Sequence, residues 1–284
     1  LALQNIITCT RVEGIPTTNL KAVKNDAEIR GFRSAMLKDG VAMVRFLRQM
    51  DEVMAAPLPE DGVRRFACGT PVTEMGVDKV LTALRAEQEG FRGLSFDTIA
   101  GYGHHGAIVH YEASPETDIP IEPHGLLLLD SGSQFVEGTT DITRTIAMGP
   151  LTDDECRDYT LVLMGHIDLA RVCFPTKSSG TQLDAFARQH MWRMGYNYGH
   201  GTGHGVGSRL SVHEGPHQFR ANWMPAPLMP GMTITDEPGI YRQGSHGVRI
   251  ENTMLVVAMG YSPLTVSERV PEFCELEPLT LCPI

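Results

Sequence analysis

The chain has 284 residues, of which 42% are hydrophobic and 20% charged, the composition of an ordinary soluble globular protein. Its net charge of −10 argues against nucleic acid and an anionic membrane surface as partners. No apolar run approaches the roughly 20 residues of a transmembrane helix, and no signal peptide is visible. The six cysteines form no CxxC pair, which is typical of reduced thiols, so we expect a cytoplasmic protein.

The first half of the chain predicts two helices followed by short strands. One helix begins at Asn25-Asp26, after a stretch without a clear period, and a second runs over residues 73–89. The apolar stripes that should pack inward are Ile29, Phe32, Met36, Val41, Val44 and Leu47 in the first helix, and Val77, Val80, Leu81 and Leu84 in the second. Strands are expected over residues 91–100 and 107–111, on either side of the loop GYGHHG; we expect this loop at the surface or the cleft edge.

The second half repeats this order of helices and strands. After strands at residues 126–130 and 139–146, helices are expected over residues 152–174 and 180–194, followed by strands at 232–237 and 248–257. No linker divides the chain. We therefore expect one α+β domain of two related halves, with a curved sheet covered by two pairs of helices.

Two acids follow the most apolar part of the sequence. Asp130 ends a run of four leucines, and Asp141 lies eleven residues later among threonines. Carboxylates carried by strands into an apolar interior are costly unless a positive group meets them. A simple alternative is that Asp130 caps a turn and that Asp141 pairs with Arg144.

Histidines cluster in the segment YGHGTGHGVGSRLSVHE, residues 198–214. His200 and His204 have the i, i+4 spacing of a helical zinc motif, but the alternating glycines forbid a stable helix. We therefore expect loops or strands whose backbone can pass close to a ligand. Phosphate binding is a weaker alternative, because GxxxxGK[ST] is absent and no Lys lies nearby.

Two further acids lie in apolar strands near the C-terminus. Glu237 ends the strand MTITDE, and Glu251 lies inside VRIENTMLVV. Because Arg249 is two residues before Glu251 on the same strand face, an ion pair between them is one explanation.

Taken together, Asp130, Asp141, Glu237 and Glu251 are four carboxylates, with His204 as an imidazole. Four carboxylates cannot converge without cations, because like charges in contact repel strongly. Two divalent metal ions would balance their charge. The oxygen-rich set favours Mn²⁺, and the imidazole also allows Zn²⁺, Co²⁺ or Fe²⁺. Paired metal ions about 4 Å apart are typical of hydrolytic chemistry.

These motifs resemble the M24 family of pita-bread metallopeptidases, and within it the aminopeptidase P branch. The resemblance covers nearly the whole chain and rests on AIVHY, LLLLDSGSQFVEGTTDITRT, HGTGHGVGSRLSVHEGP, TDEPGIY, GVRIEN and EPLTLCPI. It implies that Asp130 chelates one metal ion and that Asp141 and Glu251 bridge both. His204 and Glu237 would bind the other metal ion.

The resemblance also implies roles around the metals. Glu237 would shuttle the proton of the nucleophile, and His213 would stabilise the oxyanion. His110 and His200 would line the substrate pocket near the proline, while Arg249 would orient the carboxylates from outside the metal shell.

The implied activity is hydrolysis of the N-terminal Xaa-Pro bond of peptides by a metal-bridging hydroxide. The alternatives are a prolidase, which cleaves Xaa-Pro dipeptides with the same ligands, and a non-catalytic pita-bread module that binds peptides or proteins. Members of this branch carry additional N-terminal domains. We therefore expect residues 1–20 to be a remnant or linker, residues 21–284 to form the catalytic domain, and the full-length protein to be a homodimer. A first residue other than Met agrees with processing or truncation.

Overall fold

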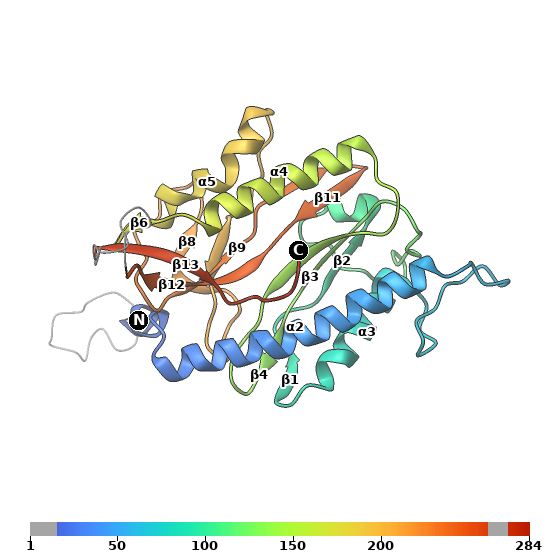
Figure 1. The fold of residues 1–284 in the computed structure, drawn as a ribbon, viewed down its shortest axis with the longest axis horizontal. Helices are drawn as coiled ribbons and strands as arrows, with labels where there is room; N and C mark the ends of the chain where they lie inside the picture. Colours follow the sequence, from blue (N-terminus) through green and yellow to red (C-terminus); the bar gives the residue numbers. More distant parts are fainter. Residues whose placement is uncertain (1–15, 261–271) are drawn as a thin grey trace, which may run out of the picture.

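The computed structural model describes residues 16–260 and 272–284, and this part of the chain forms an α+β fold (Figure 1). The expectation for residues 1–15 lies outside the described residues. In chain order, the elements are α1 Pro16–Ala22, α2 Asp26–Ala55, α3 Glu74–Ala86, β1 Phe91–Leu94, β2 Ile99–Tyr102, η1 Gly103–Ala107, β3 Leu126–Ser131, β4 Ser133–Phe135, β5 Ile142–Ala147, α4 Asp153–Ala170, β6 Phe174–Pro175, α5 Gly180–Arg193, β7 Gly203–Gly205, β8 Glu214–Phe219, β9 Thr233–Asp236, β10 Gly239–Arg242, β11 His246–Arg249, β12 Asn252–Ala258 and β13 Phe273–Pro278.

The strands form two principal antiparallel sheets. One has three strands in the order β2-β3-β5, and the other has six in the order β6-β13-β12-β9-β7-β8. A bridge between Thr143 and Glu251 joins the two sheets side by side. Two further antiparallel pairs, β1-β4 and the hairpin β10-β11, form separate two-stranded sheets. The predicted curved sheet is therefore built of two blocks, and the seam between the blocks runs through Glu251.

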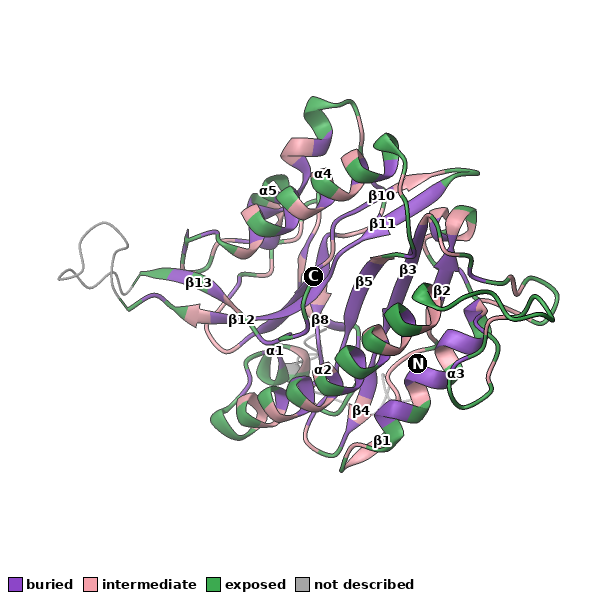
Figure 2. Cartoon of the chain, turned by 45° about the vertical axis from the view of Figure 1, so that its right-hand side comes forward, coloured by how far each residue is buried: buried purple, intermediate pink, exposed green. Residues whose placement is uncertain are grey.

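Helices cover the sheets in the two expected pairs (Figure 1). The side chains of α2 and α3 share a buried apolar cluster with β2, β3 and β5, while α4 and α5 pack against the six-stranded sheet and the β10-β11 hairpin. The central strands, such as β3 and β5, are largely buried, and the outer faces of the helices are exposed (Figure 2). None of the described helices is both long and apolar enough to cross a bilayer.

The start of α2 is as predicted, but its buried face is not. Asn25 caps the helix with its side chain, which accepts from the backbone of Ala27 and Glu28. Val41 and Val44 are exposed, whereas the prediction placed them in the apolar stripe. Asp39 is buried instead, because Arg85 of α3 forms an ion pair with it at 2.8 Å. The buried ion pair thus decides which face of α2 points inward, and the spacing of apolar residues alone does not show this.

The segment after α3 also differs from the prediction. The expected strand 91–100 is two strands, β1 and β2, which pair with different partners, β4 and β3. The expected strand 107–111 is the end of the 3₁₀ helix η1 followed by a turn. This turn brings Val109 and His110 to the wall of a pocket.

Candidate metal centre

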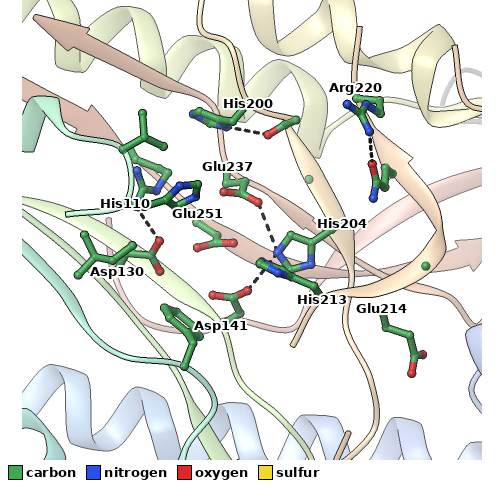
Figure 3. A pocket seen from close by; sticks show the side chains of 18 residues that line it. His110, Asp130, Asp141, His200, His204, His213, Glu214, Arg220, Glu237 and Glu251 are labelled. Carbon is green, nitrogen blue, oxygen red and sulfur yellow. Dashed lines mark hydrogen bonds and ion pairs between the residues drawn. The ribbon is translucent and has the colours of Figure 1, made fainter. Parts of the chain in front are cut away.

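The five expected metal ligands line one pocket of about 530 Å³ (Figure 3). Each comes from a different place in the two sheets. Asp130 lies near the end of β3 and His204 in the middle of β7; Asp141 precedes β5, Glu237 follows β9 and Glu251 precedes β12. The short strand β7 supplies His204, and strand ends and short loops supply the other four side chains.

Strand register explains why residues so far apart in sequence meet. Asp130 lies opposite Thr143 in the β3-β5 pair, and Thr143 bridges to Glu251 across the seam. On the other side of Glu251, β12 pairs with β9 and β9 pairs with β7. The glycines around His204 permit this close packing, because a Cβ on Gly203 would lie 1.8 Å from the carbonyl oxygen of Thr235. Gly203 is therefore required by the close approach of strand β9. The sequence had suggested that the glycines let the backbone approach a ligand.

Three of the side chains already form a cluster able to hold a metal ion. One ligand atom from each of Asp141, His204 and Glu251 lies within 4.8 Å of the others. His204 Nε2 is 3.4 Å from Asp141 Oδ2 and 3.5 Å from Glu237 Oε1. Asp130 faces the same pocket, and its Oδ1 is buried without a hydrogen-bond partner among the described residues.

Burial and mutual repulsion act strongly on these acids. Burial raises the pKa of Asp141 to about 6 and that of Glu237 to about 7. Burial also raises the pKa of Glu251 well above its usual range, and the charges of Asp141 and Glu237 add to the effect. Burial lowers the pKa of His204, but Asp141 and Glu237 outweigh it and raise that pKa to about 9.

These shifts have one physical cause, an excess of negative charge in a desolvated space. A divalent cation would remove it, because a metal ion favours the ionised carboxylate and the neutral imidazole. Oxygen donors with one imidazole suit Mn²⁺, Zn²⁺ or Co²⁺. Together with the unpartnered Asp130 oxygen, the donor set fits a dinuclear centre.

Both simple ion-pair alternatives are wrong. Arg249 donates to Asp130 Oδ2 at 2.7 Å, and Glu251 accepts instead from the hydroxyl of Thr143 at 2.8 Å. Arg144 does not pair with Asp141. It donates to backbone oxygens, including those of Glu251 and Cys282, and to the side chain of Asn252.

A hydrogen-bond chain connects Arg249 to the histidine loop. Arg249 Nη1 donates to the hydroxyl of Tyr241 at 2.8 Å, and that hydroxyl lies 2.8 Å from His200 Nε2. Burial lowers the pKa of His200 to about 4, so its imidazole is neutral. The sequence did not single out Tyr241, although its motif TDEPGIY contains it.

The other expected pocket residues lie around this centre. His213 stacks edge-on against His204, with the ring centroids 4.3 Å apart, and burial lowers its pKa. His110 reaches the pocket from the turn after η1. His200, His204, His213 and His110 therefore share one cavity, as Figure 3 shows.

Comparison with known proteins identifies the family. The model of metallopeptidase family M24 matches residues 30–258. The chain belongs to metallopeptidase family M24. It is 43% identical to a probable Xaa-Pro aminopeptidase P of Laccaria bicolor, over 95% of this chain and 40% of that protein. It is 41% identical to Xaa-Pro aminopeptidase 1 of Dictyostelium discoideum, over 93% of this chain and 40% of that protein.

Solved M24 structures share the fold. The X-prolyl aminopeptidase of Caenorhabditis elegans, described as a cytosolic enzyme with a di-nuclear active site, superposes with a TM-score of 0.85 at 34% identity, over 95% of this chain and 41% of that one. A prolidase from Pyrococcus furiosus gives a TM-score of 0.73 at 27% identity, over 94% of this chain and 68% of that one. The predicted α+β pita-bread fold is thus confirmed. The chain spans about two fifths of the length of the aminopeptidases that it matches.

The sequence did not indicate one polar cluster, which is centred on Glu74 and holds the segment before and after His110. The carboxylate of Glu74 is fully buried and accepts from the backbone of Tyr102, from the ring of His105 and from the hydroxyl of Tyr111. The rings of His105 and Tyr111 stack at 4.3 Å. The cluster therefore anchors both ends of the segment that carries His110. The only sequence signal was the GYGHHG loop, whose partner lies about 30 residues earlier.

Proposed function

We propose that the chain is the catalytic part of a dinuclear metalloaminopeptidase that hydrolyses the N-terminal Xaa-Pro bond of peptides. The observation that carries this proposal is the convergence of four carboxylates and one imidazole in a single pocket. The M24 relatives named Xaa-Pro aminopeptidase support the reaction, and the di-nuclear active site of the C. elegans structure supports the number of metal ions.

In this proposal the five ligands hold two divalent cations. Asp130 would hold one cation, His204 and Glu237 would hold the other, and Asp141 and Glu251 would contribute to both. When bound, such cations polarise a carbonyl and lower the pKa of a water molecule. We propose Mn²⁺ first, with Zn²⁺ and Co²⁺ as alternatives, because the donors are mainly carboxylate oxygens.

The pocket residues would also move a proton, bind the peptide and hold the ligand Asp130. Glu237 would accept a proton from the attacking water and pass it to the proline nitrogen, which leaves as a secondary amine when the Xaa-Pro C–N bond breaks. The N–H of His213 donates to the oxyanion that develops on the scissile carbonyl. His110 and His200 lie against the proline ring. Arg249 holds Asp130 through its bond at 2.7 Å, and Tyr241 holds the far side of Arg249.

A prolidase is the second candidate, because solved prolidases share the fold. It requires the same ligands but accepts only Xaa-Pro dipeptides, so cleavage of a tripeptide separates the two. A non-catalytic peptide-binding module is a weaker candidate, since all five predicted ligands line the pocket.

We propose further that residues 21–284 form the catalytic domain and that residues 1–20 lead into it. Helix α1, Pro16–Ala22, crosses this boundary, and Lys24 just after it forms an ion pair with Glu214 at 2.6 Å. The full-length protein is proposed to be a cytoplasmic homodimer. The cytosolic C. elegans relative supports the location.

The deciding experiment is hydrolysis of the tripeptide Arg-Pro-Pro by metal-stripped protein after addition of Mn²⁺, Co²⁺ or Zn²⁺. Restored cleavage that Glu251→Gln abolishes would establish the aminopeptidase. Two bound metal ions without cleavage would mean that this part of the protein is not sufficient. Failure to bind metal would contradict the centre itself.

A further inference from the structure

The wall of the pocket opposite β3 carries an arginine that no role above uses. Gln218 in β8 and Arg220 just after it line the same pocket as the proposed metal ligands. Figure 3 shows Arg220 in this pocket. A Cβ placed on Gly201 would lie 3.7 Å from the Cβ of Arg220. Arg220 therefore lies directly beside the loop that carries His200.

Arg220 has little compensation for its charge. Its Nη1 donates to Gln218 Oε1 at 3.1 Å, a neutral acceptor, and its Nε is buried without a partner among the described residues. Within that part of the chain no carboxylate forms an ion pair with it. Glu214 on the same strand is already held by Lys24 at 2.6 Å. A partly buried guanidinium without an anionic partner is unfavourable, so an anionic group of a ligand would bind favourably at this position.

Arg220 is also separate from the carboxylates of the centre. Among the described residues, no hydrogen bond or ion pair joins Arg220 to Asp130, Asp141, Glu237 or Glu251, whose partners include Arg249, His204 and Thr143. Arg249 is in turn held by Asp130 at 2.7 Å. One side of the pocket thus carries the acidic side chains of the proposed metal centre. The β8 side carries a positive group that, in the described part of the chain, forms no hydrogen bond or ion pair with them. This arrangement matches a zwitterion.

We propose that Arg220 binds a carboxylate of the peptide substrate, so that the enzyme prefers short peptides with a free C-terminus or an acidic residue just after proline. The proposal rests on the proposed peptidase function, which places the substrate α-amine at the carboxylates. The planar fork of an arginine can bind both oxygens of a carboxylate, which gives it a preference for this group over an amide.

The test compares Arg-Pro-Pro with its C-terminal amide. In the Mn²⁺-loaded protein we expect kcat/KM to be about tenfold higher for the free acid, the effect of one charge-assisted contact. Arg220→Gln should bring the ratio of acid to amide close to one, and Arg220→Lys should retain part of it. Arg193→Gln, which removes an exposed charge from α5, is the matched control and should keep the full ratio.

Two further peptides identify the source of the carboxylate. A preference for the dipeptide acid Arg-Pro over its amide assigns it to proline, whereas recovered activity on Arg-Pro-Asp amide assigns it to the side chain of the third residue. A ratio near one in the wild-type protein, or an unchanged ratio in Arg220→Gln, overturns the proposal. If no peptide is cleaved although two metal ions are bound, this part of the protein is not sufficient for catalysis, and the ratio of acid to amide measured as Kd by calorimetry still tests Arg220. Absence of peptide binding overturns the proposal as well.

Discussion

Thr143 donates its hydroxyl to Glu251 Oε2 at 2.8 Å across the seam between the two sheets. The two residues also form the backbone bridge that joins β5 to the segment before β12. Thr143 thus fixes one oxygen of Glu251, the proposed bridging ligand. Because a buried carboxylate with one held oxygen has fewer orientations, the hydroxyl preorganises the centre before any cation binds.

Replacement of this hydroxyl should weaken metal binding. We expect Thr143→Val, which keeps the shape of the side chain, to lower the affinity for Mn²⁺ by about 10- to 100-fold, the usual effect of losing an outer partner of a ligand. Competition with a chromogenic chelator would measure this. Thr160→Val on the exposed face of α4 is the control. Equal affinities for Thr143→Val and wild type would show that Thr143 is only structural.

The buried ion pair between α2 and α3 should dominate the contact of these helices. Asp39→Ala leaves Arg85 buried without its partner, so we expect a loss of about 3–5 kcal/mol in the free energy of unfolding. The same two segments carry an exposed pair, Arg45 with Glu87, at 2.6 Å. Glu87→Ala should cost less than about 1 kcal/mol. Urea unfolding of both variants checks the contrast, and similar losses would contradict it.

The sequence indicated the pocket residues better than it indicated which faces of the helices are buried. The five residues predicted as metal ligands and the histidines His110, His200 and His213 do line one pocket, as the motifs indicated, and their roles stay predictions. Val41 and Val44 were misassigned, since the i, i+3, i+4 pattern of α2 fits two faces and the buried Asp39 chooses between them. That choice depends on Arg85, which lies 46 residues away.

Polar contacts between distant segments were the other limit. Arg249 was assigned a role in orienting carboxylates, but only the fold shows that its partner is Asp130 rather than Glu251, because strand register decides which side chain faces it. Tyr241 and Glu74 were missed for the same reason. Each acts through a partner that no local pattern indicates, His200 for Tyr241 and His105 for Glu74.

Acid should destabilise the protein partly through His217. Its Nε2 lies 2.8 Å from the backbone oxygen of Thr233, and burial lowers its pKa to about 4. The unfolded chain has a histidine pKa near 6.5, so the unfolded state binds a proton first. The contribution of His217 is therefore complete above about pH 6.5 and is lost as the pH falls towards 4, in total about 3 kcal/mol.

The His217→Gln variant isolates this term, because glutamine does not titrate. We expect the difference in unfolding free energy between wild type and His217→Gln to shrink in favour of the variant by about 3 kcal/mol between pH 7 and pH 4. His190→Gln is the control, since His190 lies near the surface beside Asp168. A difference that stays constant across this range would mean that His217 has the same pKa in the folded and unfolded states.

Glu74 should hold His110 in place. Its carboxylate accepts from His105 at 2.9 Å and from Tyr111 at 2.8 Å, and glutamine can satisfy only one of these donors fully. We expect Glu74→Gln to cost about 1–3 kcal/mol and to speed amide hydrogen exchange in residues 103–111. With His110 less fixed, kcat for Arg-Pro-Pro should fall.

His104 provides the control for this last change. It is exposed next to His105 in the same loop, so His104→Asn should leave both exchange and kcat unchanged. Exchange in β3, which carries Asp130, should stay slow in both variants. If Glu74→Gln lowers stability without faster exchange in residues 103–111, then Glu74 supports the core of α3 and does not position His110. If exchange rises while kcat is unchanged, the loop is anchored by Glu74 but His110 does not contact the substrate.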